Sequence, residues 1–329
     1  MSSYHSWLGR VLLLAYWAPL AAQPQLVIEA SGVTRRGDSL LVVDDSAIGA
    51  YFRVPVPPKS GMLMPLNRQG TQRMNLVNAV AVDLEGIDSL ADGRIAFLSE
   101  RMRSLIGRSG IIVEYEGDLS EFAKRGLEGV AVRPLAGAVS RIAIVWEGGY
   151  PDYPSVPALL RGPLGRKSMP ARVVIHDLQP RERGKRLRLR DALQTVELDL
   201  PVMPGVEPDA QRFRVPDLVW YLWPGSEQPE WGFLMLMSSQ NSVEKPHYMH
   251  HWLQRFNMSG KRIGDPLDLA EFLPPKVSAA NWEGLSWFEP GKSVVMVHEG
   301  ERDLPPNAFV LELPASWRFG GATASGNSR

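Results

Sequence analysis

Short apolar runs separated by turn residues recur along the whole chain. The clearest pair covers residues 281–288 and 293–299, with a Pro-Gly-Lys turn between the two runs. Two such runs joined by a short turn predict a β-hairpin. Because the second strand of a hairpin runs back along the first, Glu283 near the start and Glu299 at the end should lie on the same rim.

The same pattern occurs elsewhere in the chain. A carboxylate-glycine pair begins a predicted hairpin, and a second carboxylate ends it. Glu85-Gly86 is followed by a second acid at Glu100, and Glu128-Gly129 by one at Glu147. A weaker copy begins at Ser31-Gly32. Self-similarity of this kind indicates a repeat architecture.

The long interval before Glu283 has room for two more units. The candidates begin at Ala171 and at Pro216, where Asp217 takes the place of the glutamate. About six units, each of a few strands, predict an all-β fold, a six-bladed β-propeller. The alternative is a β-sandwich in which the Glu-Gly pairs occur by chance. We expect strands from both termini, beginning with residues 26–30, to close the ring.

Composition agrees with this fold class. The chain has 329 residues, of which 44% are hydrophobic, and its 30 Gly and 27 Pro suit many short strands and tight turns. The formal net charge is zero, so no bulk electrostatic field favours nucleic acid or an anionic membrane as a partner. The absence of cysteine excludes disulfides, thiolate metal sites and a cysteine nucleophile.

The N-terminus has the pattern of a secretory signal peptide. An apolar run over residues 11–20 follows Arg10, and Ala21 and Ala22 follow the run. The run is too short for a membrane span of about 20 residues. We therefore predict a signal peptide over 1–22, a periplasmic or secreted protein without a membrane span in the mature chain, one propeller domain over 23–319 and a disordered tail over 320–329. An uncleaved anchor or leader is the alternative.

The repeated acids are the main candidates for chemistry. Inner strands that begin with Glu85, Glu128 and Glu283, and with Asp217, would bring these carboxylates to one mouth of the central channel. Neighbouring like charges raise one another's pKa, so a positive group must compensate them. Nearby bases such as Arg101, Arg133 and His298 would give a purely structural network, whereas calcium or another divalent cation would give a metal site, because carboxylate oxygens are its preferred ligands.

One basic segment could bind a substrate. Residues 181–190 hold six basic residues, and their alternation predicts a strand with one cationic face. This strand is either a solvated edge protected by charge or a surface on which Arg188 and Arg190 bind an anion. Arg101 and His298 are further substrate-binding candidates. His247, His250 and His251 are better explained by a polar loop than by a zinc site.

The chain contains no G-x-S-x-G, H-E-x-x-H, P-loop or G-x-G-x-x-G motif. The boxes at Glu85-Gly86, at residues 125–132 and at residues 281–287, with the acids that end their hairpins, resemble the phytase-like family described as "esterase-like activity of phytase". The resemblance implies an exported β-propeller that hydrolyses esters or phosphoesters.

From these observations we expect a metal-assisted hydrolase of a small anionic ester or phosphoester, with Glu85, Glu128 and Glu283 as catalytic residues and the same three with Asp217 as metal ligands. The alternative is a non-catalytic periplasmic propeller that binds a ligand or a protein through the same mouth. The sequence does not specify the substrate or the oligomeric state.

Overall fold

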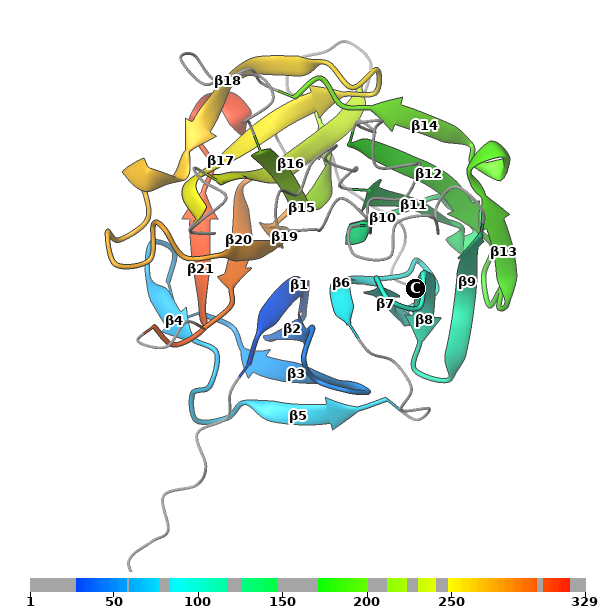
Figure 1. Ribbon diagram of the computed structural model, residues 1–329, viewed down its shortest axis with the longest axis horizontal. Coiled ribbons are helices and arrows are strands. Elements are labelled where there is room, and N and C mark those ends of the chain that lie inside the picture. The colour runs from blue at the N-terminus through cyan, green and yellow to red at the C-terminus, as the bar shows by residue number, and fades with distance from the viewer. Residues whose placement is uncertain are drawn as a thin grey trace, which may run out of the picture.

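The computed structural model describes residues 28–57, 59–76, 83–116, 126–146, 171–200, 212–223, 230–240, 248–300 and 304–319. In this part of the chain, five small sheets stand around a central axis as the blades of a β-propeller (Figure 1). The all-β propeller predicted from the sequence is therefore confirmed. The predicted signal peptide and tail lie outside the described residues.

The blades follow one another along the chain, with one exception at the closure of the ring. Blade 1 consists of β1 (Ala30–Arg36), β2 (Ser39–Asp44), β3 (Ala50–Pro55) and β5 (Gln72–Asn75). Blade 2 consists of β6 (Leu84–Ser89), β7 (Ile95–Ser99), β8 (Ser104–Gly107), β9 (Gly110–Glu116) and β13 (Lys185–Arg188). Blade 3 consists of β10 (Leu127–Pro134), β11 (Ser140–Trp146), β12 (Arg172–Leu178) and β14 (Gln194–Glu197).

Blade 4 consists of β15 (Arg212–Leu222), β16 (Trp231–Gln240), β17 (Tyr248–Asn257) and β18 (Arg262–Asp268). Blade 5 consists of β19 (Trp282–Glu289), β20 (Ser293–His298), β21 (Asn307–Glu312) and β4 (Leu63–Pro65). Among the described residues, the helices are short 3₁₀ turns at η2 (Ala136–Ala138), η3 (Leu189–Asp191), η5 (Leu269–Glu271) and η6 (Ala315–Trp317). None of them is long and apolar enough to cross a membrane.

The described chain forms five blades, one fewer than predicted. The stretch that begins at Ala171 is not the start of a blade, because β12 pairs with β11 along its whole length, from Ser140 opposite Leu178 to Trp146 opposite Arg172. It is the third strand of blade 3. Residues 147–170 separate these two strands in the sequence, and this long interval gave β12 the spacing of a separate unit.

The ring closes through β4, which lies in the chain between the third and fourth strands of blade 1. In β4, Leu63 pairs with Phe309 and Met64 with Ala308, so this segment becomes the outer strand of blade 5. The prediction that residues 26–30 pair with the C-terminal strand is wrong in its described part, because Ala30 begins the innermost strand and pairs with Asp44.

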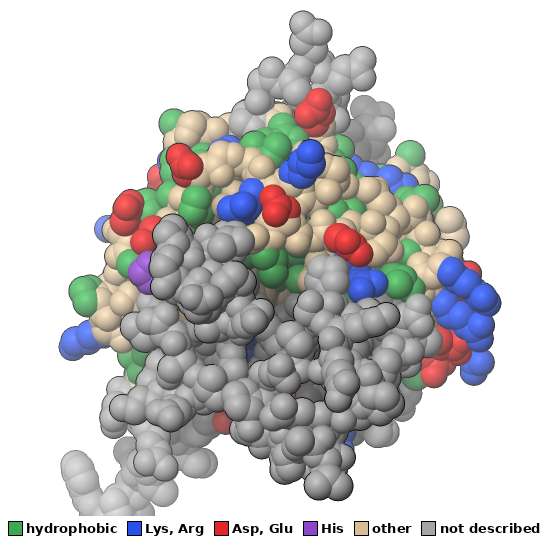
Figure 2. Space-filling view, turned by 45° about the horizontal axis from the view of Figure 1, so that its top comes forward, with side chains coloured by type: hydrophobic (Ala, Val, Ile, Leu, Met, Phe, Trp, Pro, Cys, Tyr) green, Lys and Arg blue, Asp and Glu red, His purple; other side chains and the backbone are tan. Residues whose placement is uncertain are grey.

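The basic segment forms the outer edge of blade 2. β13 pairs in parallel with β9, and the innermost strand of the same sheet is β6. Figure 2 shows Lys and Arg side chains gathered with Asp and Glu side chains at the right-hand edge, the side on which β13 lies in Figure 1. The predicted edge strand is present, and its cations lie beside acids.

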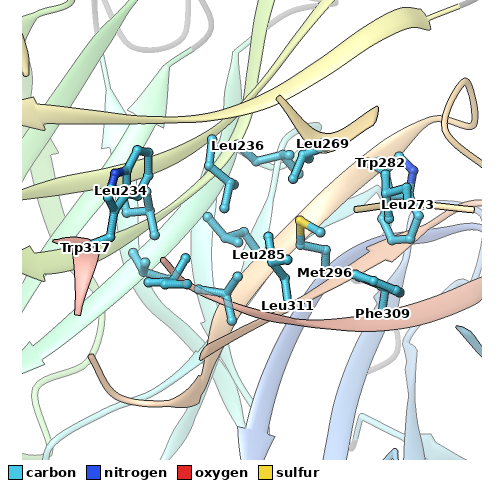
Figure 3. Packing of buried hydrophobic residues seen from close by; sticks show 14 of the residues in the cluster. Leu234, Leu236, Leu269, Leu273, Trp282, Leu285, Met296, Phe309, Leu311 and Trp317 are labelled. Atoms are coloured by element: carbon cyan, nitrogen blue, oxygen red, sulfur yellow. The ribbon is translucent and has the colours of Figure 1, made fainter. Parts of the chain in front are cut away.

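Five apolar clusters fill the boundaries between neighbouring blades. Figure 3 shows the cluster between blades 4 and 5, where Leu236 and Leu269 face Leu285 and Met296. Strands in the middle of a blade are covered on both faces, so they are continuously apolar rather than alternating; every residue of β20 is buried. Among the described residues, the cluster between blades 1 and 2 is the smallest.

The repeated glycines allow the inner strands to approach one another. A β-carbon on Gly284 would lie 2.9 Å from Cα of Gly32, and one on Gly32 would lie 3.0 Å from Cα of Gly86. Each of the five inner strands also has a register shift at this position. In blades 2 and 5 the extra residue of this bulge is the glutamate before the glycine, Glu85 or Glu283.

Candidate functional site

The bulges bring the three predicted glutamates to one mouth of the propeller. Arg214, on β15, places Nη1 3.0 Å from Oε1 of Glu283 and Nη2 3.5 Å from Oε2 of Glu128. Glu85 interacts electrostatically with both Glu128 and Glu283. Blades 3 and 5 therefore hold the guanidinium of Arg214 between their carboxylates, and the carboxylate of blade 2 lies near both of them.

The ends of the second strands add acids at the same mouth. Asp45 follows β2, Glu100 follows β7 and Glu299 follows β20. In blade 5, Nδ2 of Asn281 donates hydrogen bonds to Oε1 of Glu283 at 2.7 Å and to Oε1 of Glu299 at 2.8 Å. The two acids predicted to share a rim are thus held together by an amide.

Blade 2 has an acid where blade 5 has this amide. Asp83 precedes the bulge residue Glu85 by two positions, as Asn281 precedes Glu283. The carboxylate oxygens of Asp83, Glu85 and Glu100 lie within 4.8 Å of one another. A second set in blade 1, Glu29, Asp44 and Asp45, has the same spacing.

Burial and mutual repulsion raise the pKa values of the mouth acids. Burial is the larger cause for Glu85, and the charges of Glu128 and Glu283 add to it, so the pKa of Glu85 lies well above its usual value. The same two causes raise the pKa of Asp45 to about 7 and that of Glu299 to about 7. These carboxyl groups hold protons near neutral pH and would release them to a bound cation.

The groups that compensate the acids differ from those expected. Besides Arg214, Arg103 places Nη1 3.7 Å from Oε1 of Glu100. Arg133 instead stacks over the rings of Trp220 and Trp231, at 4.8 and 4.4 Å from their centroids. Arg101 is exposed in the turn after β7. Arg214 was missed in the sequence because blade 4 has Pro216 at the bulge and so lacks the Glu-Gly start.

His298 does not face solvent. It is fully buried at the end of β20, 4.7 Å from the ring centroid of Trp282, and its Nε2 is 3.2 Å from Nδ2 of Asn307. Burial lowers its pKa to about 4, so it is neutral at pH 7. Its position is that of a core histidine, and it offers no charge to an anionic substrate.

The other histidines do not form the predicted loop in the described chain. His250 and His251 belong to β17, where neighbouring side chains point to opposite faces. His250 is exposed and lies 3.8 Å from Asp268, whereas His251 is buried. Two histidines on opposite faces of one strand cannot share a metal ion. His247 lies outside the described residues.

Arg188 and Arg190 lie far from the mouth in the fold. Nε of Arg188 is 3.4 Å from Oε2 of Glu116, and Nε of Arg190 is 3.8 Å from Oδ1 of Asp191. Both arginines are exposed, at the opposite edge of blade 2 from the inner strand that carries Glu85. The structure does not bring these two candidates together with the carboxylates.

Asp217 lies one layer deeper than the mouth acids. Its Oδ1 accepts the N–H of Leu218 at 2.8 Å, and its Oδ2 accepts the N–H of Leu285, on blade 5, at 2.7 Å. The N–H of Val130, on blade 3, is a further donor, and Gly129 leaves room for the carboxylate beside the backbone. The oxygens of Asp217 thus join three blades, and this geometry does not favour Asp217 as a metal ligand.

Asp88 plays the same part between other blades. Its carboxylate accepts the N–H of Val132, on blade 3, at 2.7 Å and the hydroxyl of Thr34, on blade 1, at 3.1 Å. Burial raises its pKa to about 6, although these donors oppose the rise. Asp88 was not identified in the sequence, because a single aspartate inside a strand carries no recognisable motif.

The residues at the mouth fit a hard divalent cation. Calcium takes several oxygen ligands at flexible geometry, and Asp83, Glu85 and Glu100 offer oxygens from one small volume. In addition, Oδ1 of Asp45 is buried and has no hydrogen-bond partner in the described part of the chain. The described acids outnumber the two arginines, so a cation would relieve the repulsion between them.

The chain matches no family model and no curated protein. Solved structures similar to it include a protein of unknown function from Bacteroides caccae, with 10% identity and a TM-score of 0.36 over 85% of this chain and 74% of the other. They also include a putative gluconolactonase, with 9% identity and a TM-score of 0.38 over 87% of this chain and 89% of the other.

A gluconolactonase from Xanthomonas campestris is 11% identical, with a TM-score of 0.33 over 88% of both chains. At these identities and TM-scores the similarities carry no functional argument. The predicted membership of the phytase-like family is supported by no family model and remains a prediction.

Proposed function

We propose that the acidic mouth binds a divalent cation, calcium first among the candidates, and that the protein hydrolyses a small anionic ester or phosphoester there. The observation that carries this proposal is the convergence of Asp83, Glu85 and Glu100, with oxygens within 4.8 Å of one another, on the mouth shared with Glu128, Arg214 and Glu283. The resemblance of the Glu-Gly boxes to the phytase-like family points the same way.

Distinct residues would hold the ion and move protons. Asp83, Glu85 and Glu100 would be its ligands, and a cation bound there would polarise a substrate oxygen and lower the pKa of a water molecule. Glu299 and Asp45, with pKa values of about 7, can accept and return a proton near neutral pH.

Arg214 is the positive side chain between Glu128 and Glu283. It holds these two carboxylates in place and presents the mouth's own positive charge to an anionic substrate. In this arrangement Glu128 and Glu283 act as the groups that fix Arg214, whereas the sequence predicted them as bases or ligands.

The proposal includes export. Residues 1–22 would act as a signal peptide, and the mature protein would work in the periplasm or outside the cell. N-terminal sequencing of protein recovered from the exported fraction tests this point. A sequence beginning near Gln23 supports it, and one beginning near Met1 contradicts cleavage.

Calorimetry and activity assays test the site. Protein stripped with a chelator is titrated with calcium, and hydrolysis of p-nitrophenyl acetate and p-nitrophenyl phosphate is measured with and without calcium. We expect a binding heat and calcium-dependent turnover, both reduced at least tenfold in Glu85→Gln. Arg188→Ala is the matched control on the outer edge of the same blade and should behave as the unmodified protein.

Absence of any calcium heat, of any shift in melting temperature and of turnover would contradict the proposal.

A specific observation favours a second candidate, a non-catalytic propeller that binds a ligand or a protein partner. Arg214 and Asn281 already tie Glu128, Glu283 and Glu299 into a network between blades. Calcium binding without turnover on either ester would favour this second function.

A further inference from the structure

A pocket rich in arginine lies at the other end of the propeller from the acidic mouth. It is lined by the end of β1 at Arg36, the β6–β7 turn at Arg94, the β8–β9 turn at Arg108 and by Arg183. The inner strands start at the mouth, so these strand ends and turns lie at the opposite end of the axis. The pocket has a volume of about 320 Å³, within the range of small-molecule sites.

The floor of the pocket is apolar and aromatic. Tyr51 of blade 1 and Phe97 of blade 2 are buried, with ring centroids 5.0 Å apart, and Ile112 is buried beside them. This is the boundary with the smallest apolar cluster among the described residues. A second pocket of about 280 Å³ shares Arg36 and Tyr51 with the first, so the hollow continues along blade 1.

Two of the three guanidinium nitrogens of Arg94 donate hydrogen bonds, and the third has no acceptor among the described residues. Its Nε donates to Oδ2 of Asp92 at 2.8 Å, and its Nη1 donates to the carbonyl oxygen of Glu182 at 3.0 Å. Nη2 is buried and has no hydrogen-bond partner in the described chain. An unsatisfied buried N–H of a cation is costly, and Arg94 is a lining residue whose guanidinium lacks an acceptor for one nitrogen.

The other arginines are also available to a ligand. Arg36 donates from Nη2 to the carbonyl oxygen of Gly93 at 3.2 Å and forms no ion pair with a described residue. Arg108 and Arg183 are exposed at the rim, and neither forms an ion pair within the described ranges. Among the described residues that line the pocket, none is acidic. Four guanidinium groups therefore surround an apolar floor without a carboxylate among the lining residues.

We propose that this pocket binds a small phosphate monoester whose organic part is a ring or a similar flat apolar group. The guanidinium fork matches the oxygens of a phosphate. Arg94 is already paired with Asp92, and a dianion compensates more of the charge on Arg36, Arg108 and Arg183 than a carboxylate does. The Tyr51–Phe97 floor takes the apolar part. This site is separate from the proposed catalytic mouth and shares no residue with it.

Isothermal titration with phenylphosphonate in the presence of a chelator tests the proposal, because this ligand carries the ring and the dianion but cannot be hydrolysed. We expect measurable binding, at least tenfold weaker in the double variant Arg108→Ala/Arg183→Ala. The matched control, Arg188→Ala/Arg190→Ala, removes two exposed arginines outside the pocket and should change the dissociation constant less than twofold. Glu85→Gln should leave binding unchanged, which separates this site from the mouth.

Two further ligands test the chemistry. Inorganic phosphate, which lacks the ring, and benzoate, which lacks the dianion, should each bind at least fivefold more weakly than phenylphosphonate. The proposal is overturned if phenylphosphonate does not bind, if both double variants weaken it equally, or if phosphate or benzoate binds as tightly as phenylphosphonate.

Discussion

The propeller has two layers of carboxylates along its axis, and they differ in the groups that surround each carboxylate. Asp217 and Asp88 lie inside the channel, and each accepts hydrogen bonds from the backbone of a neighbouring blade. Glu85 and Glu299 lie one layer out, at the mouth, where other carboxylates surround them. Both layers consist of largely buried acids on neighbouring strands, but Asp217 and Asp88 accept N–H groups from neighbouring blades, whereas nearby carboxylates raise the pKa values of Glu85 and Glu299.

The difference separates structure from chemistry. Carboxylates that accept several backbone N–H groups stabilise the contact between blades and have no oxygen to offer. Carboxylates that face one another keep protons near neutral pH and gain from a cation. The acids at the mouth are therefore the part of the channel that a ligand can change.

The largest expected loss of stability follows a substitution in the inner layer, which contains Asp217 and Asp88. Asp217→Ala should lower the free energy of unfolding by about 3 kcal/mol, because the N–H groups of Leu218 and Leu285 lose their acceptor in a buried position. Urea unfolding followed by tryptophan fluorescence measures this loss. Glu283→Gln, in the outer layer, should cost less than about 1 kcal/mol. Equal losses in the two variants would end the distinction between the layers.

Next in size is the change expected at Arg214. Arg214→Gln should destabilise the calcium-free protein by about 2 kcal/mol, because Glu128 and Glu283 lose their shared cation in a largely buried site. Calcium should then raise the melting temperature of the variant more than that of the unmodified protein. An identical calcium-induced shift in both proteins would show that the ion does not act on these carboxylates.

The pH dependence of stability gives a smaller effect. The pKa of Asp45 and that of Glu299 are raised to about 7 in the folded state, so their contribution is complete near pH 4 and is lost as pH rises through 7. The buried His176 and His298 have pKa values lowered to about 4, so their contribution is lost as pH falls from 6.5 towards 4.

Between pH 6.5 and 8 the unfolded chain still loses part of its histidine charge, and the resulting rise in stability offsets part of the loss from the acids. Comparison with Glu299→Gln therefore isolates the contribution of Glu299. Over this window the stability of the calcium-free protein should fall relative to that of Glu299→Gln by about 0.5 kcal/mol, after allowance for solvent screening. Thermal unfolding at a series of pH values measures both profiles, and parallel profiles would contradict the raised pKa of Glu299.

The smallest effect is expected at the outer edge. Arg188→Ala removes an exposed ion pair with Glu116 and should change the free energy of unfolding by less than about 0.5 kcal/mol. The value of kcat/KM on any hydrolysed ester should also stay within twofold of the unmodified protein. A tenfold loss of kcat/KM would restore the prediction that this strand guides the substrate.

The sequence predicted the parts of the fold that repeat. The glycines at 32, 86 and 284 marked inner strands, because the close approach of strands at the axis requires glycine in each copy. The convergence of Glu85, Glu128 and Glu283 followed from the same repeat. The blade that begins with β15 was placed correctly from Pro216-Asp217, but Asp217 has the strand position of Val130 in blade 3, two residues beyond that of Glu128, so its depth in the channel was not predicted.

Other parts of the site have no local sequence pattern. Arg214 and Arg103 compensate the acids from different blades, and neither lies in a repeated box. The arginine pocket combines residues from blades 1 and 2 with Arg183. Arg183 lies between β12, the third strand of blade 3, and β13, the outer strand of blade 2. Such arrangements depend on which blades become neighbours. They also depend on the long-range pairing of β13 with β9, which brings a later part of the chain back to blade 2.

The closure through β4 sets an order of events during synthesis. Residues 63–65 leave the ribosome early, but their partners at 307–309 are made near the end of the chain. Until then the donated strand and the edge of blade 5 cannot pair with each other, and unpaired strand edges favour association with other chains. Blades 2, 3 and 4 can be complete while the ring is still open. Completion of the toroid is therefore a late, long-range step, and a nascent chain that stops short of residue 307 would keep an open edge for chaperones or for aggregation.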